Sequence, residues 1–228
     1  MPDGGIWDQY WHYDRIASCF DGAGDANYGE SVAAGWRAFF ADLARGACIL
    51  DLCTGNGAVP LIAAGDGRAS AIVAVDRAAI DPPAFVSRHA ALYAAVAFRG
   101  GVDVEALPLP DGGFDAVTSQ YGIEYSDLGK SLPEAVRMLA PGGRIRFVVH
   151  AADGVVARDA KAVIVDANLL LDEIDLPGHA ARCFGAVLAA ERGGGETALA
   201  DSSFAAFQEA LTRTADGIAA AADRTMFR

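Results

Sequence analysis

The sequence predicts an α/β fold in which a mostly parallel sheet carries helices on both faces. Short apolar runs of strand length alternate with segments of helical period from about residue 31 to residue 150. Alternation at this pitch is typical of parallel strands joined by right-handed crossovers. The first run, residues 48–52, leads into a glycine turn and then a helix. This unit places a ligand at the carboxyl edge of such a sheet.

Five apolar runs are expected to form the strands. Each is short enough for a strand that is buried on both faces, and turn-forming residues separate the runs. The third run is rich in alanine, although alanine is depleted in strands. The expected strands span residues 48–52, 71–76, 95–99, 115–121 and 144–150.

Helical segments alternate with these strands. Ser31 is a suitable N-cap for the first helix, in which Trp36 and Phe40 share an apolar side. Pro60 fits the first turn of the second helix, where its missing N–H has no internal partner. Pro141-Gly142-Gly143 ends the last helix. The expected helices span residues 31–44, 58–64, 84–96 and 128–139.

The pattern divides the chain into three parts. Residues 1–30 are rich in aromatic side chains, with an expected helix over residues 6–20 before a glycine-rich link. This part is either a cap that buries its aromatic side chains on the sheet or a mobile lid over a ligand, since aromatics before a hinge suit closure. Residues 31–150 form the expected ligand-binding core. Residues 151–228 are an alanine-rich helical extension in which we expect no strand.

The composition excludes several classes of function. Eighteen Lys and Arg residues stand against 30 Asp and Glu, so the formal net charge is −12. Such acidity repels phosphate backbones and disfavours a nucleic-acid partner. The cysteines show neither Cys-x-x-Cys pairing nor His partners at metal spacing, so we expect reduced thiols and no metal site. The four are Cys19, Cys48, Cys53 and Cys183.

Targeting signals are not evident. Residues 1–8 lack the basic region and the apolar core of a signal peptide. No uncharged apolar run approaches the roughly 20 residues that cross a bilayer. We therefore expect a cytoplasmic protein without a membrane span.

The glycine turn carries the strongest functional signal. Asp51 lies near the end of the first strand, and Gly55 and Gly57 follow it. Glycine adopts backbone angles barred to other residues and lets a ligand approach the main chain. Asp76 ends the second strand, 19 residues beyond Gly57. A carboxylate there either caps the next helix or accepts both hydroxyl protons of a ribose, and the spacing favours the ribose.

The turn discriminates between two ligand classes. A dinucleotide-binding turn has a third glycine where this chain has Pro60, which argues against a nicotinamide cofactor. The spacing Asp51-x-Cys53-x-Gly55-x-Gly57 instead resembles the first motif of class I S-adenosylmethionine-dependent methyltransferases, an acid followed by Gly-x-Gly-x-Gly. Cys53 stands where a glycine is usual.

Later segments extend the resemblance over residues 47–150. Asp103-Val104 resembles the segment that meets the adenine ring, residues 109–117 resemble the run into strand four of the ubiquinone-biosynthesis-like branch, and residues 139–144 resemble the turn before strand five. The resemblance implies a Rossmann-like, doubly wound core with S-adenosylmethionine as the methyl donor.

The same resemblance assigns roles to individual residues. It implies that Asp51 binds the methionine ammonium, that Asp76 binds the ribose and that Asp103 accepts from the adenine amino group. The backbone N–H of Val104 would reach the ring, which would lie between Arg77 or Ile80 on one side and Leu107 on the other. The implied donor site comprises Asp51, Cys53, Thr54, Gly55, Gly57, Asp76, Arg77, Asp103, Val104, Ser119 and Gln120.

The implied reaction is an in-line displacement at the sulfonium methyl group by a small-molecule acceptor. The protein would mainly supply proximity, alignment and exclusion of water. A general base is needed only if the acceptor must lose a proton. Candidates for that base are Tyr121, Glu124, His150 and, from the N-terminal part, His12. No metal is expected.

Two alternatives remain at this stage: an NAD(P)-dependent oxidoreductase, which Pro60 disfavours, and a non-catalytic module that binds S-adenosylmethionine or a partner. The second gains weight because members of the family close their sheet with two further strands, the last antiparallel. No such hairpin is evident after residue 150. A partner chain, for example a second copy in a homo-oligomer, would then cover the exposed edge.

Overall fold

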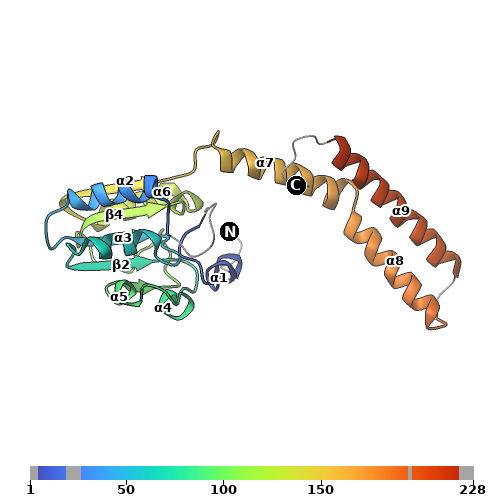
Figure 1. Cartoon of the computed structure of the whole chain (residues 1–228), viewed down its shortest axis with the longest axis horizontal. Coiled ribbons are helices and arrows are strands. Elements are labelled where there is room, and N and C mark those ends of the chain that lie inside the picture. The colour runs from blue at the N-terminus through green and yellow to red at the C-terminus, as the bar shows by residue number, and fades with distance from the viewer. Residues whose placement is uncertain (1–4, 19–26, 195–196, 221–228) are drawn as a thin grey trace. The chain divides into compact units, whose positions relative to one another are not determined.

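The computed structural model describes residues 5–18, 27–194 and 197–220 and divides the chain into two compact units, residues 1–150 and 151–228 (Figure 1). The elements of the first unit are α1 (Gly5–Trp11), α2 (Glu30–Ala41), β1 (Cys48–Leu52), α3 (Ala58–Asp66), β2 (Ala71–Val75), α4 (Pro82–Phe85), α5 (Ala90–Tyr93), β3 (Ala97–Arg99), β4 (Phe114–Gln120), η1 (Ile123–Tyr125), α6 (Leu128–Met138) and β5 (Leu139–Val148).

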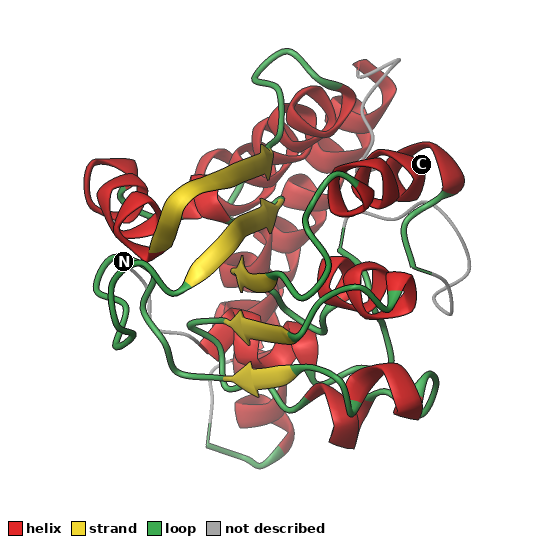
Figure 2. Ribbon diagram, turned by 90° about the vertical axis from the view of Figure 1, so that its left-hand side faces the viewer, coloured by secondary structure: helices red, strands yellow, loops and turns green. Residues whose placement is uncertain are grey.

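The strands of this unit form one parallel sheet. Their order is β3-β2-β1-β4-β5, and each neighbouring pair runs in the same direction. Figure 2 shows the strands side by side with helices on both faces. The order reverses between β1 and β4, so a ligand crevice is expected at the carboxyl ends of these two strands. The doubly wound α/β fold that the sequence predicts is confirmed.

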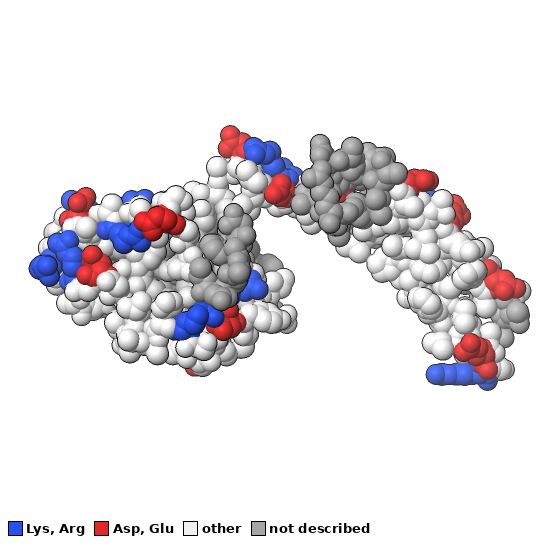
Figure 3. Space-filling view, viewed as in Figure 1, with Lys and Arg blue, Asp and Glu red and all other residues white. Residues whose placement is uncertain are grey.

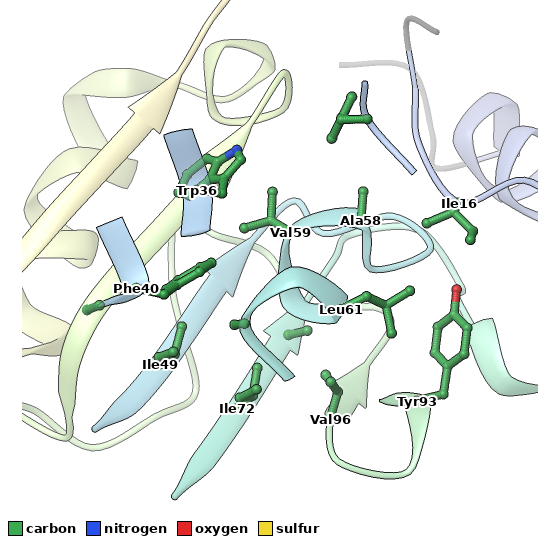
Figure 4. Close-up of a cluster of buried hydrophobic side chains, with 14 of the residues drawn as sticks. Ile16, Trp36, Phe40, Ile49, Ala58, Val59, Leu61, Ile72, Tyr93 and Val96 are labelled. Atoms are coloured by element: carbon green, nitrogen blue, oxygen red, sulfur yellow. The ribbon is translucent and has the colours of Figure 1, made fainter. Parts of the chain in front are cut away.

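The alternation of side chains along the strands creates two cores. Ile49 of β1 and Ile72 of β2 pack against the face covered by α2 and α3, where Trp36 and Phe40 are buried (Figure 4). Leu50 and its neighbours of the opposite parity pack with α6 on the other face. A sheet that is covered on both faces explains why its strands read as apolar runs rather than as alternating ones.

Several expected boundaries are wrong. The helix predicted over residues 84–96 is two short helices, because Val86 is extended and His89 has a positive φ of 60°. Helix α2 has Gly29 as its N-cap, so Ser31 is not the cap.

The two ends of the first unit also differ from expectation. Strand β5 begins at Leu139, so Pro141-Gly142-Gly143 lies within the strand instead of before it. The N-terminal helix expected over residues 6–20 ends at Trp11 where the chain is described, and Cys19 and Phe20 lie outside the described residues.

The second unit is helical where it is described. Phe184 of one helix and Phe207 of another lie 5.8 Å apart, ring centroid to ring centroid, and Cys183 is buried between packed helices. Figure 3 shows few charged side chains on the visible face of this unit. Its described part contains no strand, and therefore no antiparallel hairpin. Its elements are α7 (Val155–Asn168), a π-helical turn (Leu169–Glu173), α8 (Leu176–Glu191) and α9 (Thr197–Ala220).

Candidate functional site at the reversal point of the sheet

The turn between β1 and α3 has the backbone that the glycines predict. Gly55 and Gly57 have φ values of 52° and 86°, in the left-handed region. Cys53 has a φ of 54°, a conformation that costs a non-glycine residue about 1–2 kcal/mol. A Cβ atom at Gly122 would lie 2.4 Å from the Cβ of Cys53, so the bare Gly122 makes room for this side chain.

A small cavity lies beside this turn. Its volume is about 20 Å³, room for one or two water molecules. Five of the residues predicted from the sequence contribute to its lining, so the fold brings together residues from both sides of the reversal point. The lining residues are Trp11, Ile16, Ser18, Tyr28, Asp51, Cys53, Thr54, Ala58, Val59, Gln120 and Tyr121.

Asp51 is the buried charge of the cavity. Its exposed fraction is 2%, and the hydroxyl of Thr118 on the neighbouring strand donates to its Oδ1 over 2.6 Å. Burial raises the pKa of Asp51 to about 7, although the bond from Thr118 opposes the shift. The side chain is therefore poised between its neutral and charged forms at neutral pH, and a cation beside it would favour the charged form.

Gln120 presents a hydrogen-bond donor to the same cavity. Residues 118 and 120 of β4 point to one face of the sheet because side chains alternate along a strand. The indole Nε1 of Trp36 donates to Oε1 of Gln120 and fixes its amide. The amide nitrogen is buried and has no hydrogen-bond partner among the described residues. A buried donor without a partner is costly, so this atom suits an acceptor group on a ligand.

The N-terminal segment covers the turn. In Figure 1, α1 lies beyond the arrowheads of β2 and β4. Trp11 packs with Ala78 and Ile80, which follow β2. The amide nitrogen of Asn56, in the middle of the glycine turn, donates to the carbonyl oxygens of Trp11 and Arg15 over 3.0 and 2.8 Å.

Part of the first unit is similar to known proteins. Residues 49–143 match the model of a family described as a methyltransferase domain. A demethylmenaquinone methyltransferase from Thermus thermophilus is 38% identical over 115 residues, 48% of this chain and 51% of that protein. A ubiquinone/menaquinone biosynthesis C-methyltransferase from Geobacter sulfurreducens is 36% identical over 105 residues, 44% of this chain and 40% of that protein.

Over these residues, the chain is similar to class I S-adenosylmethionine-dependent methyltransferases of the ubiquinone/menaquinone type. The resemblance drawn from the sequence is confirmed, and neither alternative is favoured by these matches. Proteins of this class use S-adenosylmethionine as the methyl donor. The chain spans about half the length of the relatives it matches, or less.

A solved structure supports the fold of the methyltransferase domain. The cyclase SpnF has a TM-score of 0.52 and 22% identity, over 67% of this chain and 62% of that one. A likeness at this identity shows the fold alone. Since that protein is named a cyclase, the fold by itself does not assign the reaction.

The second predicted acid of the methyltransferase domain lies next to the glycine turn. Asp76 accepts from the backbone N–H of Gly55 over 2.7 Å through Oδ2, and from that of Ala78 over 2.8 Å through Oδ1. Burial raises its pKa, and these bonds oppose the shift. The described lining of the cavity does not include Asp76 or the exposed Arg77 beside it.

The predicted adenine segment also lies outside the cavity. Asp103 is exposed, and its Oδ1 accepts from the backbone N–H of Glu105 over 2.9 Å. Val104 is buried in the core on the α6 face. The backbone N–H of Val102 donates to the carbonyl oxygen of Asp76 over 2.9 Å, so the segments of the two acids are adjacent.

Ser119 is separated from the cavity by its position in the strand. It points to the opposite face from Gln120, and its hydroxyl accepts from the backbone N–H of Ile123 over 3.2 Å. The sequence pattern predicted that both residues lie at the carboxyl end of β4, but it did not predict that only Gln120 points to the face of the cavity.

The charges of the site fit a cationic donor. Burial raises the pKa of the Cys53 thiol well above its usual value, and four surrounding carboxylates add to the shift: Asp76, Asp51, Glu124 and Asp103. Acids that gather around one turn suit the sulfonium and the ammonium of S-adenosylmethionine. The unpartnered amide nitrogen of Gln120 suits the methionine carboxylate.

Three of the four candidate bases lie together. The ring of Tyr121 stacks on that of His150 with centroids 4.4 Å apart. Nδ1 of His150 lies 2.9 Å from Oε1 of Glu124. His12 is not among them, since it is exposed, bonds to the carbonyl oxygen of Asp8 and lies against Phe85.

Neither a cluster of metal ligands nor a helix suited to cross a membrane occurs in the part of the chain that the structure describes. No group of three or more His, Cys, Asp or Glu residues is arranged there to hold a metal ion. None of the helices described is both long enough and apolar enough to cross a membrane.

The raised pKa of Asp51 predicts a pH-dependent effect on stability. The Asp51 carboxyl keeps its proton up to about pH 7 in the folded protein but only to about pH 3.8 in the unfolded chain. The free energy of unfolding that Asp51 contributes is therefore lost as the pH rises from about 3.8 through 7. We expect Asp51→Asn to raise the free energy of unfolding at pH 8 by about 2–4 kcal/mol relative to its effect at pH 4. Urea unfolding across this range measures the difference. The exposed Asp81→Asn is the control, and an Asp51→Asn effect that does not vary with pH would contradict the assignment.

Proposed function

We propose that this chain binds S-adenosylmethionine at the glycine turn and transfers its sulfonium methyl group to a small-molecule acceptor. The observation that carries the proposal is the buried Asp51, beside a bare turn and an unpartnered amide of Gln120, in a domain of this family. When bound, S-adenosylmethionine supplies an activated methyl group.

The residues of the chain then bind and orient the donor. Asp51 pairs with the ammonium, and the amide nitrogen of Gln120 donates to the methionine carboxylate. The carboxylate of Asp76 accepts from the backbone N–H groups of Gly55, Ala78 and Arg77, and a carboxylate has about four acceptor positions, so it can hold the turn and also accept from a ribose hydroxyl. Asp103 lies on the adjacent segment, on the adenine side.

Titration calorimetry with S-adenosylhomocysteine, the product form of the donor, tests the proposal. We expect saturable binding in the micromolar range, and we expect NADH to give no heat. An absence of heat and of thermal stabilisation at millimolar S-adenosylhomocysteine would contradict the proposed donor site.

Removing the second acid should weaken donor binding. We expect Asp76→Ala to reduce the affinity for S-adenosylhomocysteine by about 1.5–3 kcal/mol, the scale of hydrogen bonds to a charged group. Asp76→Asn removes the charge but keeps one acceptor oxygen, so we expect it to weaken binding less than Asp76→Ala does. Asp81→Ala, exposed on the same loop, should bind as the native protein does, and an unchanged affinity in folded Asp76→Ala would remove this residue from the site.

The acceptor is proposed from the relatives and from the base candidates. The Thermus relative is named for demethylmenaquinone, and the Geobacter relative is named for C-methylation in ubiquinone/menaquinone biosynthesis. A reduced quinone carries a ring hydroxyl, and loss of its proton raises the electron density at the ring carbon that would attack the methyl group. Oε1 of Glu124 lies at hydrogen-bond distance from Nδ1 of His150 and so orients the imidazole. We propose that this imidazole takes the proton of the hydroxyl. The carbon–methyl bond forms as the sulfur–methyl bond breaks, and the sulfur leaves as a neutral thioether. The methylated ring carbon then loses its hydrogen as a proton and the ring oxygen regains one, which restores the aromatic ring and its hydroxyl.

Variants of the His150–Glu124 pair test this role. With a reduced demethylmenaquinone analogue as acceptor, we expect His150→Asn to lower kcat by about 10²–10⁴-fold, the range of general base catalysis. Glu124→Gln should lower kcat less and shift its pH profile. The affinity for S-adenosylhomocysteine should change by no more than about twofold, because neither residue contacts the donor in this proposal. His12→Asn is the control, and full turnover by His150→Asn would exclude His150 as the base.

A further inference from the structure

We propose that the N-terminal segment, residues 5–18, is an internal plug: Trp11 occupies the donor position on the glycine turn, and the donor must displace it to bind. The inference rests on the proposed donor site and concerns its regulation. It differs from a lid, which would close over a bound donor.

Trp11 lies directly on the bare backbone of the turn. A Cβ atom added to Gly55 would lie 2.3, 2.5 and 2.6 Å from three atoms of the indole ring. Gly55 is the residue whose missing side chain lets a ligand reach the main chain. In this structure the indole makes that approach, and Trp11 is only 8% exposed.

The same indole covers the side on which adenine is expected. Trp11, Ala78 and Ile80 form one buried apolar cluster, and Phe98 packs against it. Ala78 and Ile80 follow β2 and lie just beyond the ribose-binding candidate Asp76. The indole of Trp11 thus already makes the apolar contacts that the adenine ring of the donor would make in this place.

Asn56 fastens the plug to the turn that it covers. Its exposed fraction is 0%, and its amide nitrogen reaches the carbonyl oxygens of Trp11, Tyr13 and Arg15 at 3.0, 3.4 and 2.8 Å. Two N–H groups are shared among three acceptors. At the start of the segment, the backbone N–H of Ala79 donates to Oδ1 of Asp8 over 2.7 Å.

The remaining space does not admit a donor. The cavity of about 20 Å³ compares with the roughly 300–1,000 Å³ of sites that hold ligands of this size. A lid closed over its ligand would leave a ligand-sized space beneath it. Only molecules in which the plug is displaced can bind the donor. The apparent Kd is the intrinsic Kd divided by the fraction of such molecules, so the closed plug weakens donor binding.

Substitution of Trp11 distinguishes a plug from a wall of the binding site. We expect Trp11→Ala to bind S-adenosylhomocysteine at least about fivefold more tightly than the native chain and to associate faster, because the closed state is lost. Ile6→Ala is the matched control, since Ile6 lies on the same helix but is 72% exposed. Its affinity should stay within about twofold of native. Weaker or unchanged binding by Trp11→Ala would overturn the plug, whereas an absence of binding by every variant would overturn the proposed donor site and the plug with it.

Hydrogen exchange on the native full-length chain provides a test that does not depend on the folding of a variant. When S-adenosylhomocysteine saturates the protein, we expect the amides of residues 5–18 to lose protection while those of residues 48–57 gain it. Increased protection of residues 5–18 would show a segment that closes over the ligand and would overturn the proposal.

Discussion

The architecture of the site depends on a carboxylate held out of water at the end of β1. Asp51 is 2% exposed, and Thr118 of the neighbouring strand donates to it. Burial of a charge is costly without a partner, which is why its pKa rises to about 7. Proteins tolerate such destabilising groups where binding requires them. A cationic ligand would supply the missing partner, so the carboxylate links the stability of the fold to its proposed function.

The rest of the site is arranged around this carboxylate by the geometry of the sheet. Reversal of the strand order between β1 and β4 opens the crevice, and alternation along β4 turns Thr118 and Gln120 toward the face that carries α2. Trp36 of that helix orients the amide of Gln120. The left-handed turn after β1 exposes its backbone to the same space. Local backbone requirements and packing of the helices therefore converge on one small volume.

Features that depend on neighbouring residues in the sequence could be predicted, whereas contacts between distant residues could not. The strand–turn–helix unit and Asp51 followed from contiguous residues, and the match of the family model to residues 49–143 agrees with them. The cover formed by Trp11 and Asn56 was not foreseen in detail, because their contact spans 45 residues and leaves no periodic signal. The break after Val86 depends on the positive φ of His89, which helical periodicity does not reveal. Ser119 was assigned to the site because the sequence showed the end of β4 but not which residues share a face with Asp51.

Proton release on donor binding measures the central claim most directly. Calorimetric titrations of the native protein with S-adenosylhomocysteine, at pH 7 in two buffers of different ionisation enthalpy, count the protons released. Because Asp51 has a pKa of about 7 before binding and is ionised beside an ammonium after it, the account predicts release of about half a proton per ligand, and none in Asp51→Asn. Binding without proton release, or equal release by both proteins, would contradict the claim that this carboxylate receives the donor.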